Sequence, residues 1–221
     1  MITACIFDLD GVIVDTAKFH YLAWKKLAEH LGVEFTEEDN EHLKGVSRMQ
    51  SLEYILLKGG IQISNEEKLR LATLKNEWYV ESIKHIDASE ILPGSEELLK
   101  DLKNNQIKIS LGSASKNAIA ILNGIGLMSY FDFISDGNST DKSKPDPEVF
   151  LIAAKGMGKL PQECIVVEDS IKGIEAARAG GFRTLGIGDE EVLSDAENIV
   201  KDLAQVSWEV LNNWYNKTKN L

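Results

Sequence analysis

The chain has 221 residues, of which 24 are Lys or Arg and 35 are Asp or Glu, so its formal net charge is −11. This acidic excess argues against binding to nucleic acids or anionic membrane surfaces, because both need a basic patch. An anionic small-molecule substrate stays open, since a few cations can be gathered locally. A chain of this length is expected to form one or two domains.

The cysteines indicate the compartment. Cys5 and Cys164 both lie inside apolar runs, which predicts buried, reduced thiols in a reducing environment. No basic segment precedes the apolar start of the chain, so we expect no signal peptide. No apolar run approaches the roughly 20 residues that a membrane span needs. We therefore expect a cytoplasmic protein, and we expect it to be a monomer.

Strand and helix patterns alternate along most of the chain. The first ten residues are predicted to form a buried strand, because the apolar run Ala4–Phe7 leads into Asp8 to Gly11. Further apolar runs predict strands at 107–111, 131–134, 164–167 and 184–187, with amphipathic helical patterns between them. Continuous apolar strands alternating with helices are typical of an α/β fold with a doubly wound parallel sheet, a Rossmann-like core.

Residues 15–87 interrupt this alternation with helical patterns alone. Asp15 or Thr16 can cap a first helix, and Ser47 can cap another. The sequences Thr36-x-x-Asp and Ser64-x-x-Glu resemble capping boxes. We therefore predict a helical cap domain at 15–87, inserted after the first strand of a core domain formed by residues 1–14 and 88–221. A block inserted there can close over a site at the end of that strand.

The first candidate site residues follow strand one. Asp8 and Asp10 are two residues apart, so in an extended segment their carboxylates project to the same side. The carboxyl ends of strands are where open α/β sheets bind ligands. Taken alone, the pair also fits a turn with solvated acids.

Three further groups fall at predicted strand ends. Ser113 begins a run of small and hydroxyl residues, Lys144 precedes a proline, and Glu168 and Asp169 end a strand. Singly they fit a helix cap, a surface cation and an acid pair at a helix start. Together they predict phosphoryl transfer, with Mg²⁺ between the carboxylates and with Ser113 and Lys144 on phosphoryl oxygens. A carboxylate nucleophile then gives an aspartyl-phosphate, and a second carboxyl transfers the proton.

These motifs carry a family resemblance. The runs Asp8-Leu9-Asp10-Gly11-Val12, Ser113-Ala114-Ser115, Lys144-Pro145 and Glu168-Asp169-Ser170 resemble, in order and spacing, the four motifs of the haloacid dehalogenase superfamily of phosphotransferases. The helical insertion resembles that family's small cap. The resemblance implies Asp8 as nucleophile and Asp10 as general acid and base. It also implies Mg²⁺ held by the Asp8 carboxylate, the Asp10 backbone carbonyl, Glu168 and Asp169.

The resemblance extends to substrate binding. It implies that Ser113 and Lys144 bind the transferring phosphoryl group. It assigns a second phosphate to four residues: Arg48, Ser115, Lys116 and Asn117. It places eight residues on the sugar side or at the cap hinge: Thr16, His20, Trp24, Lys44, Gly45, Val46, Ser47 and Lys75. His20 could also hydrogen-bond Asp10, or it could be an ordinary packed residue.

Three functions remain open from the sequence. A mutase would interconvert β-D-glucose 1-phosphate and D-glucose 6-phosphate through an aspartyl-phosphate and a sugar bisphosphate, and it must hold a phosphate at both ends. Arg48, Lys116 and Asn117 supply donors for that second phosphate and favour the mutase. The alternative enzyme is a Mg²⁺-dependent sugar-phosphate phosphatase. A sugar-phosphate sensor is the non-enzyme alternative, and it would need no nucleophile. In each case the expected ligands are sugar phosphates, not nucleic acids or membranes.

Overall fold

The fold is built around one parallel sheet. The computed structural model describes residues 1–43 and 46–218 of the chain. Six strands lie in the order β3-β2-β1-β4-β5-β6, and every neighbouring pair is parallel. The strands are β1 (Ala4–Phe7), β2 (Lys108–Gly112), β3 (Phe133–Ser135), β4 (Cys164–Glu168), β5 (Arg183–Ile187) and β6 (Asn198–Val200).

This topology confirms the predicted fold class. The strand order reverses at β1, which pairs with β2 on one side and with β4 on the other. Two details differ from prediction. The first strand covers only Ala4–Phe7 of the ten residues expected, because the chain bends at Leu9, directly after the hydrogen bond from the Asp8 N–H to β4. The sheet also gains β6, a three-residue edge strand that was not predicted.

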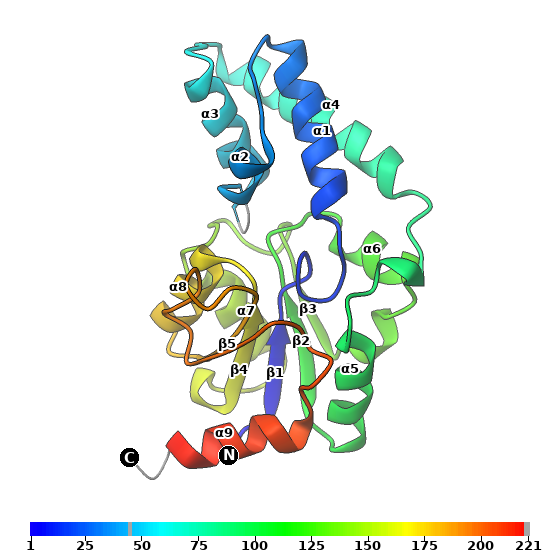
Figure 1. Ribbon diagram of the computed structural model, residues 1–221, viewed down its shortest axis with the longest axis vertical. Coiled ribbons are helices and arrows are strands. Elements are labelled where there is room, and N and C mark those ends of the chain that lie inside the picture. Colours follow the sequence, from blue (N-terminus) through cyan, green and yellow to red (C-terminus); the bar gives the residue numbers. More distant parts are fainter. Residues whose placement is uncertain (44–45, 219–221) are drawn as a thin grey trace.

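Helices cover both faces of the sheet (Figure 1). On β1, Cys5 and Phe7 pack into the core that includes α5 (Ser95–Asn104), α6 (Ala118–Gly124) and α9 (Trp208–Thr218). Ala4 and Ile6 point to the other face, toward α7 (Glu148–Gly156) and α8 (Ile171–Ala179). Since successive strand residues face opposite sides, a strand buried on both faces is apolar throughout.

A helical bundle stands above the carboxyl edge of the sheet (Figure 1). It comprises α1 (Ala17–His30), α2 (Glu37–Glu41), α3 (Arg48–Lys58) and α4 (Asn65–Ile83). The bundle has a hydrophobic core of its own, which includes Trp24, Leu27, Leu52, Ile55 and Leu71. All four helices fall within the predicted insertion at 15–87, while the domain boundaries themselves stay a prediction.

Local capping follows the sequence at three helix starts. Thr36 forms a capping box with Asp39, and Ser47 forms one with Gln50 at the start of α3. The Ser64 hydroxyl caps α4 by accepting from the Glu67 N–H, but the predicted capping box is not completed, because the Glu67 carboxylate pairs with Arg70. At the start of α1 the capping prediction is wrong. Thr16 is in the N-cap position, but its hydroxyl donates to the Asp10 carboxylate and does not cap the helix.

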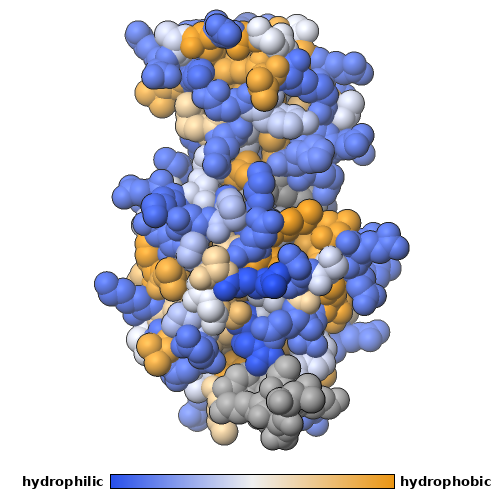
Figure 2. Space-filling view, turned by 90° about the vertical axis from the view of Figure 1, so that its left-hand side faces the viewer, coloured by the Kyte–Doolittle hydropathy of each residue, from blue (hydrophilic) through white to orange (hydrophobic). Residues whose placement is uncertain are grey.

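The surface carries scattered apolar residues among many charged ones. On the face drawn in Figure 2, hydrophobic residues form separate patches with hydrophilic residues between them. Within residues 1–43 and 46–218, no helix is both long enough and apolar enough to cross a bilayer.

Candidate active site

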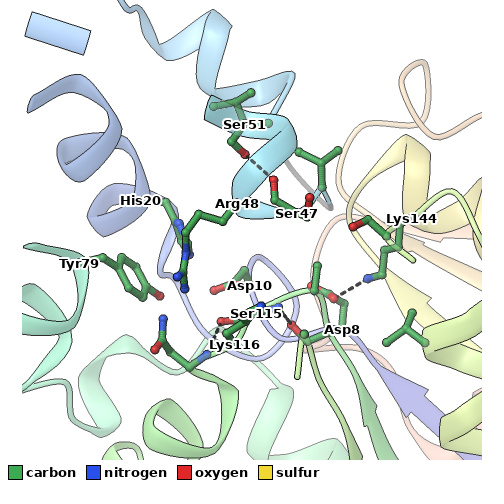
Figure 3. A pocket seen from close by; sticks show the side chains of 18 of the residues that line it. Asp8, Asp10, His20, Ser47, Arg48, Ser51, Tyr79, Ser115, Lys116 and Lys144 are labelled. Carbon is green, nitrogen blue, oxygen red and sulfur yellow. Dashed lines mark hydrogen bonds and ion pairs between the residues drawn. The ribbon is translucent and has the colours of Figure 1, made fainter. Parts of the chain in front are cut away.

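A cavity of about 250 Å³ lies between the helical bundle and the carboxyl edge of the sheet. Its wall combines residues from the end of β1, from the loops after β2 and β3, and from α1, α3 and α4. Figure 3 shows side chains from both parts pointing into this space, with Arg48 coming from the bundle and Asp8 from the sheet. Most of the predicted site residues therefore meet in one place.

Asp8 is held at the floor of the cavity by a buried cation. Its backbone N–H donates to the Val167 carbonyl at 2.9 Å, which extends the pairing of β1 with β4 by one residue. The Lys144 ammonium lies 2.6 Å from Asp8 Oδ1 and 2.7 Å from Glu168 Oε2. Burial lowers the pKa of Lys144, but the two carboxylates outweigh it, so the pKa is raised and the group stays charged.

Three acidic side chains form a cluster beside Lys144. One carboxylate oxygen from each of Asp8, Glu168 and Asp169 lies within 4.8 Å of the others. Burial raises the pKa of Asp8, Lys144 lowers it, and the neighbouring carboxylates raise it again. Burial and the mutual repulsion of these acids together raise the pKa of Asp8, and a cation bound between them would relieve that repulsion. These hard oxygen donors therefore fit a divalent cation such as Mg²⁺ or Ca²⁺.

Two glycines allow this close approach of acids. Gly11 has φ +82°, and a Cβ there would lie 2.2 Å from Asp169 Oδ2. A Cβ on Gly173 would lie 2.0 Å from Glu168 Cδ. A larger residue at either position would displace a carboxylate of the cluster, so this close packing of the acids requires glycine at both positions.

Asp10 lies two residues beyond Asp8, on the wall of the same cavity. The Thr16 hydroxyl donates a short hydrogen bond to Asp10 Oδ1. Burial raises the pKa of Asp10 to about 6, although the Lys144 and Lys75 ammonium groups lower it. A carboxyl with a pKa near 6 can both donate and accept a proton close to neutral pH.

The loop after β2 lies next to Asp8. Ser113 is buried, and its backbone N–H donates to the Ser135 carbonyl at 3.0 Å. The Ser113 hydroxyl accepts from the Ser115 N–H at 3.1 Å, and the Ser115 hydroxyl accepts from the Asn117 N–H at 3.3 Å. These bonds form a compact turn before α6, with hydroxyl groups and Lys116 facing the cavity.

Cationic side chains line the cavity from both the bundle and the core. Arg48 is the first residue of α3, and its guanidinium extends from the bundle toward the sheet side (Figure 3). Lys116 and Asn117 line the cavity from the core. Burial lowers the pKa of Arg48, yet a guanidinium stays protonated. Because a cation there is unfavourable for the dipole of α3, an anion bound at that helix start would offset a local cost.

His20 and Lys75 interact inside the bundle. The Lys75 ammonium lies 3.0 Å from His20 Nδ1 and 4.5 Å from the Trp24 ring centroid. Burial lowers the pKa of Lys75 to about 7, helped by Arg48 and opposed by Asp10. Burial also lowers the pKa of His20, with further contributions from Lys75 and Arg48. Within the described residues no hydrogen bond joins His20 to Asp10, since Asp10 accepts from Thr16 and His20 Nδ1 lies against Lys75, so the hypothesis of that bond is not supported.

The predicted substrate-side residues divide into three groups. His20, Trp24, Val46, Ser47 and Lys75 line the cavity, and so do the four residues predicted for the second phosphate. Thr16 is fully buried behind Asp10 and does not belong to the cavity wall. Lys44 and Gly45 lie outside the described residues.

Several cavity residues were not predicted. Asn76 and Tyr79 line the cavity from α4, where no motif had marked them. Tyr79 lies four positions after Lys75 on the same helix face, so its spacing was an available signal, whereas Asn76, one position after Lys75, had none. The loop after β3 supplies Gly137 and Thr140, which no motif marked. That loop is attached to the Ser113 loop by a hydrogen bond from the Gly137 N–H to the Ser115 carbonyl.

Comparisons with known proteins agree with this geometry. Residues 5–187 match the family model of the haloacid dehalogenase-like hydrolases. The β-phosphoglucomutase of Bacillus subtilis (strain 168) is 41% identical over 211 residues, 95% of this chain and 93% of the relative. The crystal structure of a β-phosphoglucomutase from Clostridium difficile has 47% identity and a TM-score of 0.97, over 100% of both chains. A phosphorylated carbohydrates phosphatase of Thermotoga maritima is 31% identical over 82% of this chain and 83% of its own length.

Proposed function

The chain belongs to the haloacid dehalogenase-like hydrolase family, and within that family we propose that it interconverts β-D-glucose 1-phosphate and D-glucose 6-phosphate, the reaction of a β-phosphoglucomutase. One observation carries this choice. A single cavity contains a nucleophile held by a buried ammonium, and it is also lined by further cationic donors, Arg48 from the bundle and Lys116 from the loop after β2. The agreement in sequence and structure with β-phosphoglucomutases supports it.

The chemistry begins at Asp8. A carboxylate oxygen of Asp8 attacks the phosphorus of a bound sugar bisphosphate, and the bond from phosphorus to the sugar oxygen breaks. Asp10 donates its proton to that leaving oxygen. When the C1 phosphoryl group is the one transferred, D-glucose 6-phosphate leaves. In the second step the C6 hydroxyl of an incoming β-D-glucose 1-phosphate attacks the phosphorus of the aspartyl-phosphate, the bond from phosphorus to the Asp8 oxygen breaks, and Asp10 takes the hydroxyl proton. The phosphoryl group thus returns to the sugar, and Asp8 is restored.

The surrounding residues hold the transferring group. The Lys144 ammonium already lies against Asp8, where it can neutralise charge on phosphoryl oxygens. The Ser113 hydroxyl and the backbone N–H groups of its loop are the other proposed donors. Asp8, Glu168, Asp169 and the Asp10 carbonyl would hold Mg²⁺, whose charge compensates the negative groups gathered there when it is bound.

The second phosphate distinguishes a mutase from a phosphatase. Arg48, Ser115, Lys116 and Asn117 are proposed to hold it while the sugar presents its hydroxyl in line with Asp8. The bundle at 15–87 would act as a cap over the core domain of 1–14 and 88–221, and closing it would exclude water from the aspartyl-phosphate. We also infer a cytoplasmic monomer, which its buried cysteines and acidic surface support.

A phosphatase acting on sugar phosphates is the second candidate. It is favoured by the 31% identity to the Thermotoga maritima phosphatase, and Asp8 with Asp10 would also serve attack by water on the aspartyl-phosphate. A sensor without catalysis is disfavoured, because a buried ammonium holds a nucleophile next to an acid of pKa about 6.

Phosphorus NMR separates the enzymes. The protein is supplied with β-D-glucose 1-phosphate, Mg²⁺ and a trace of glucose 1,6-bisphosphate. A mutase moves the signal to glucose 6-phosphate, keeps the total sugar phosphate constant and depends on the bisphosphate, because free Asp8 carries no phosphoryl group. A phosphatase accumulates inorganic phosphate and ignores the primer. Phosphate release as the main product at saturating sugar phosphate would overturn the mutase proposal.

A further inference from the structure

One hydrogen bond crosses from the helical bundle to the sheet part at the second phosphate site. The Asn117 Nδ2 group donates to Asn76 Oδ1 at 3.1 Å, and the two residues are 41 positions apart. Asn76 lies on α4, while Asn117 is the residue just before α6. Both line the cavity. The bond therefore joins the two parts of the molecule at the site itself.

Among the residues that the structure describes, the bond to Asn76 is the one hydrogen bond made by the Asn117 side chain. Its backbone N–H donates to the Ser115 hydroxyl at 3.3 Å, which fixes the start of α6 but not the side-chain torsions. The bond to Asn76 fixes those torsions. An amide nitrogen carries two hydrogens, so one N–H remains for an anion after the other has donated to Asn76.

The bond also depends on the position of α4. Lys75, the adjacent residue, places its ammonium inside the bundle against His20 at 3.0 Å. Lys75 thereby ties α4 to α1, and Asn76 ties α4 to the core. When α4 leaves the core, Asn117 loses the partner that orients its amide.

We propose that Asn76 is a positioning residue of the second phosphate site. Asn76 acts through Asn117, and it couples docking of the bundle against the core to phosphate binding. This inference rests on the proposed function. If phosphate binds better to the oriented Asn117 amide, bound phosphate in turn favours the state in which the bundle is docked on the core, because such coupling is reciprocal. Asn76 is not a catalytic residue, so the first step on Asp8 proceeds without it.

A double-mutant cycle tests the inference. The proteins are wild type, Asn76→Ala, Asn117→Ala and the double variant, with Asn123→Ala as a control on an exposed position of α6. Two readouts are taken for each protein. One is the KM for β-D-glucose 1-phosphate with saturating bisphosphate. The other is the rate at which acetyl phosphate, which has no second phosphate, labels Asp8.

A hydrogen bond of ordinary strength predicts a two- to tenfold rise in KM, by order of magnitude, for Asn76→Ala. The labelling rate should change less than twofold, and in the Asn117→Ala background Asn76→Ala should raise KM by less than twofold. Asn123→Ala should behave as wild type. Asn76→Gln, which moves the amide by one methylene, replaces Asn76→Ala if that variant folds poorly.

Two results overturn the inference. One is a rise in KM below twofold for Asn76→Ala. The other is an equal rise in KM when Asn76→Ala is introduced into the wild type and into the Asn117→Ala variant, because a structural effect of Asn76 on the bundle would not need Asn117. Failure of the proposed function is separate, since it is decided by the product that the wild type makes. If that product is inorganic phosphate, the same cycle is scored on the KM for hydrolysis.

Discussion

Asp39 should be among the most stabilising polar residues of the helical bundle. Its carboxylate is 6% exposed. It accepts hydrogen bonds from the Thr36 N–H at 2.7 Å, the Thr36 hydroxyl at 2.9 Å and the Tyr54 hydroxyl at 2.9 Å. It also forms an ion pair with the Lys58 ammonium. Thr36 precedes α2, while Tyr54 and Lys58 belong to α3, so one carboxylate ties the two helices together.

The cost of Asp39→Ala follows from these contacts. Loss of the capping box costs about 1 kcal/mol, and losing hydrogen bonds to a charged group costs about 1.5–3 kcal/mol. The Lys58 side chain is 36% exposed and can regain water, which limits the penalty of leaving it unpaired. We therefore expect a loss of about 2–4 kcal/mol in the free energy of unfolding. Asp39→Asn should lose less, because it keeps one acceptor oxygen.

The measurement is urea unfolding at pH 7, followed by circular dichroism and by tryptophan fluorescence. Two probes are needed because the bundle can unfold apart from the sheet, and Trp24 and Trp78 report on the bundle. Glu37→Ala is the matched control, since Glu37 is an exposed acid in the first turn of the same helix. A loss below about 0.5 kcal/mol for Asp39→Ala, or one equal to the control, would refute the reasoning.

The same contact predicts a pH dependence. Burial raises the pKa of Asp39, but hydrogen bonds from Lys58, Thr36 and Tyr54 outweigh it and hold the pKa well below its usual range. A depressed pKa in the folded state contributes stability above the unfolded value of about 4, and that stability is lost as the pH falls. The stability difference between wild type and Asp39→Ala should therefore be full at pH 7 and shrink progressively below about pH 4.

The remaining predictions concern the reaction. Asp8→Asn should abolish turnover and labelling by acetyl phosphate, because an amide is a poor nucleophile; a base-labile label on that variant would exclude Asp8. Asp10→Asn should keep the fold and slow turnover by about 10²–10⁴-fold, and a rate within about threefold of wild type would rule out its proton transfer. Arg48→Ala should weaken sugar bisphosphate binding by at least about tenfold and leave Asp8 labelling nearly unchanged, as titration and labelling would measure. EDTA should stop the wild-type enzyme, and Glu168→Ala should raise the Mg²⁺ concentration needed for half-maximal rate; full activity in EDTA would contradict the metal assignment.

Much of the site could be predicted because its residues lie at positions that a local sequence pattern identifies, namely the ends of apolar strands. Asp8, Ser113 and Glu168 each lie at or just beyond the end of an apolar strand. Parallel strands end at one edge of the sheet, so residues at successive strand ends are brought together by topology alone. The capping boxes of Thr36 and Ser47 were also predictable, since they involve residues three positions apart.

Other features were decided by tertiary packing. The sequence pattern could not predict β6, because three residues at a sheet edge carry too short an apolar signal. It assigned Thr16 to a helix cap, while the fold directs its hydroxyl to Asp10. It did not single out Asn76 as a site residue, while the fold pairs this residue with Asn117 from the other part of the molecule.

The physical reason is the short distance along the chain over which periodicity and capping patterns carry information. Periodicity and capping report contacts between residues a few positions apart, because a helix or strand repeats over that distance. The bond between Lys144 and Asp8 joins residues 136 positions apart, and the bond between Asn117 and Asn76 joins residues 41 apart. The sequence by itself determined which chemical groups the site contains. Only the packing of the bundle against the sheet decided which of those groups touch.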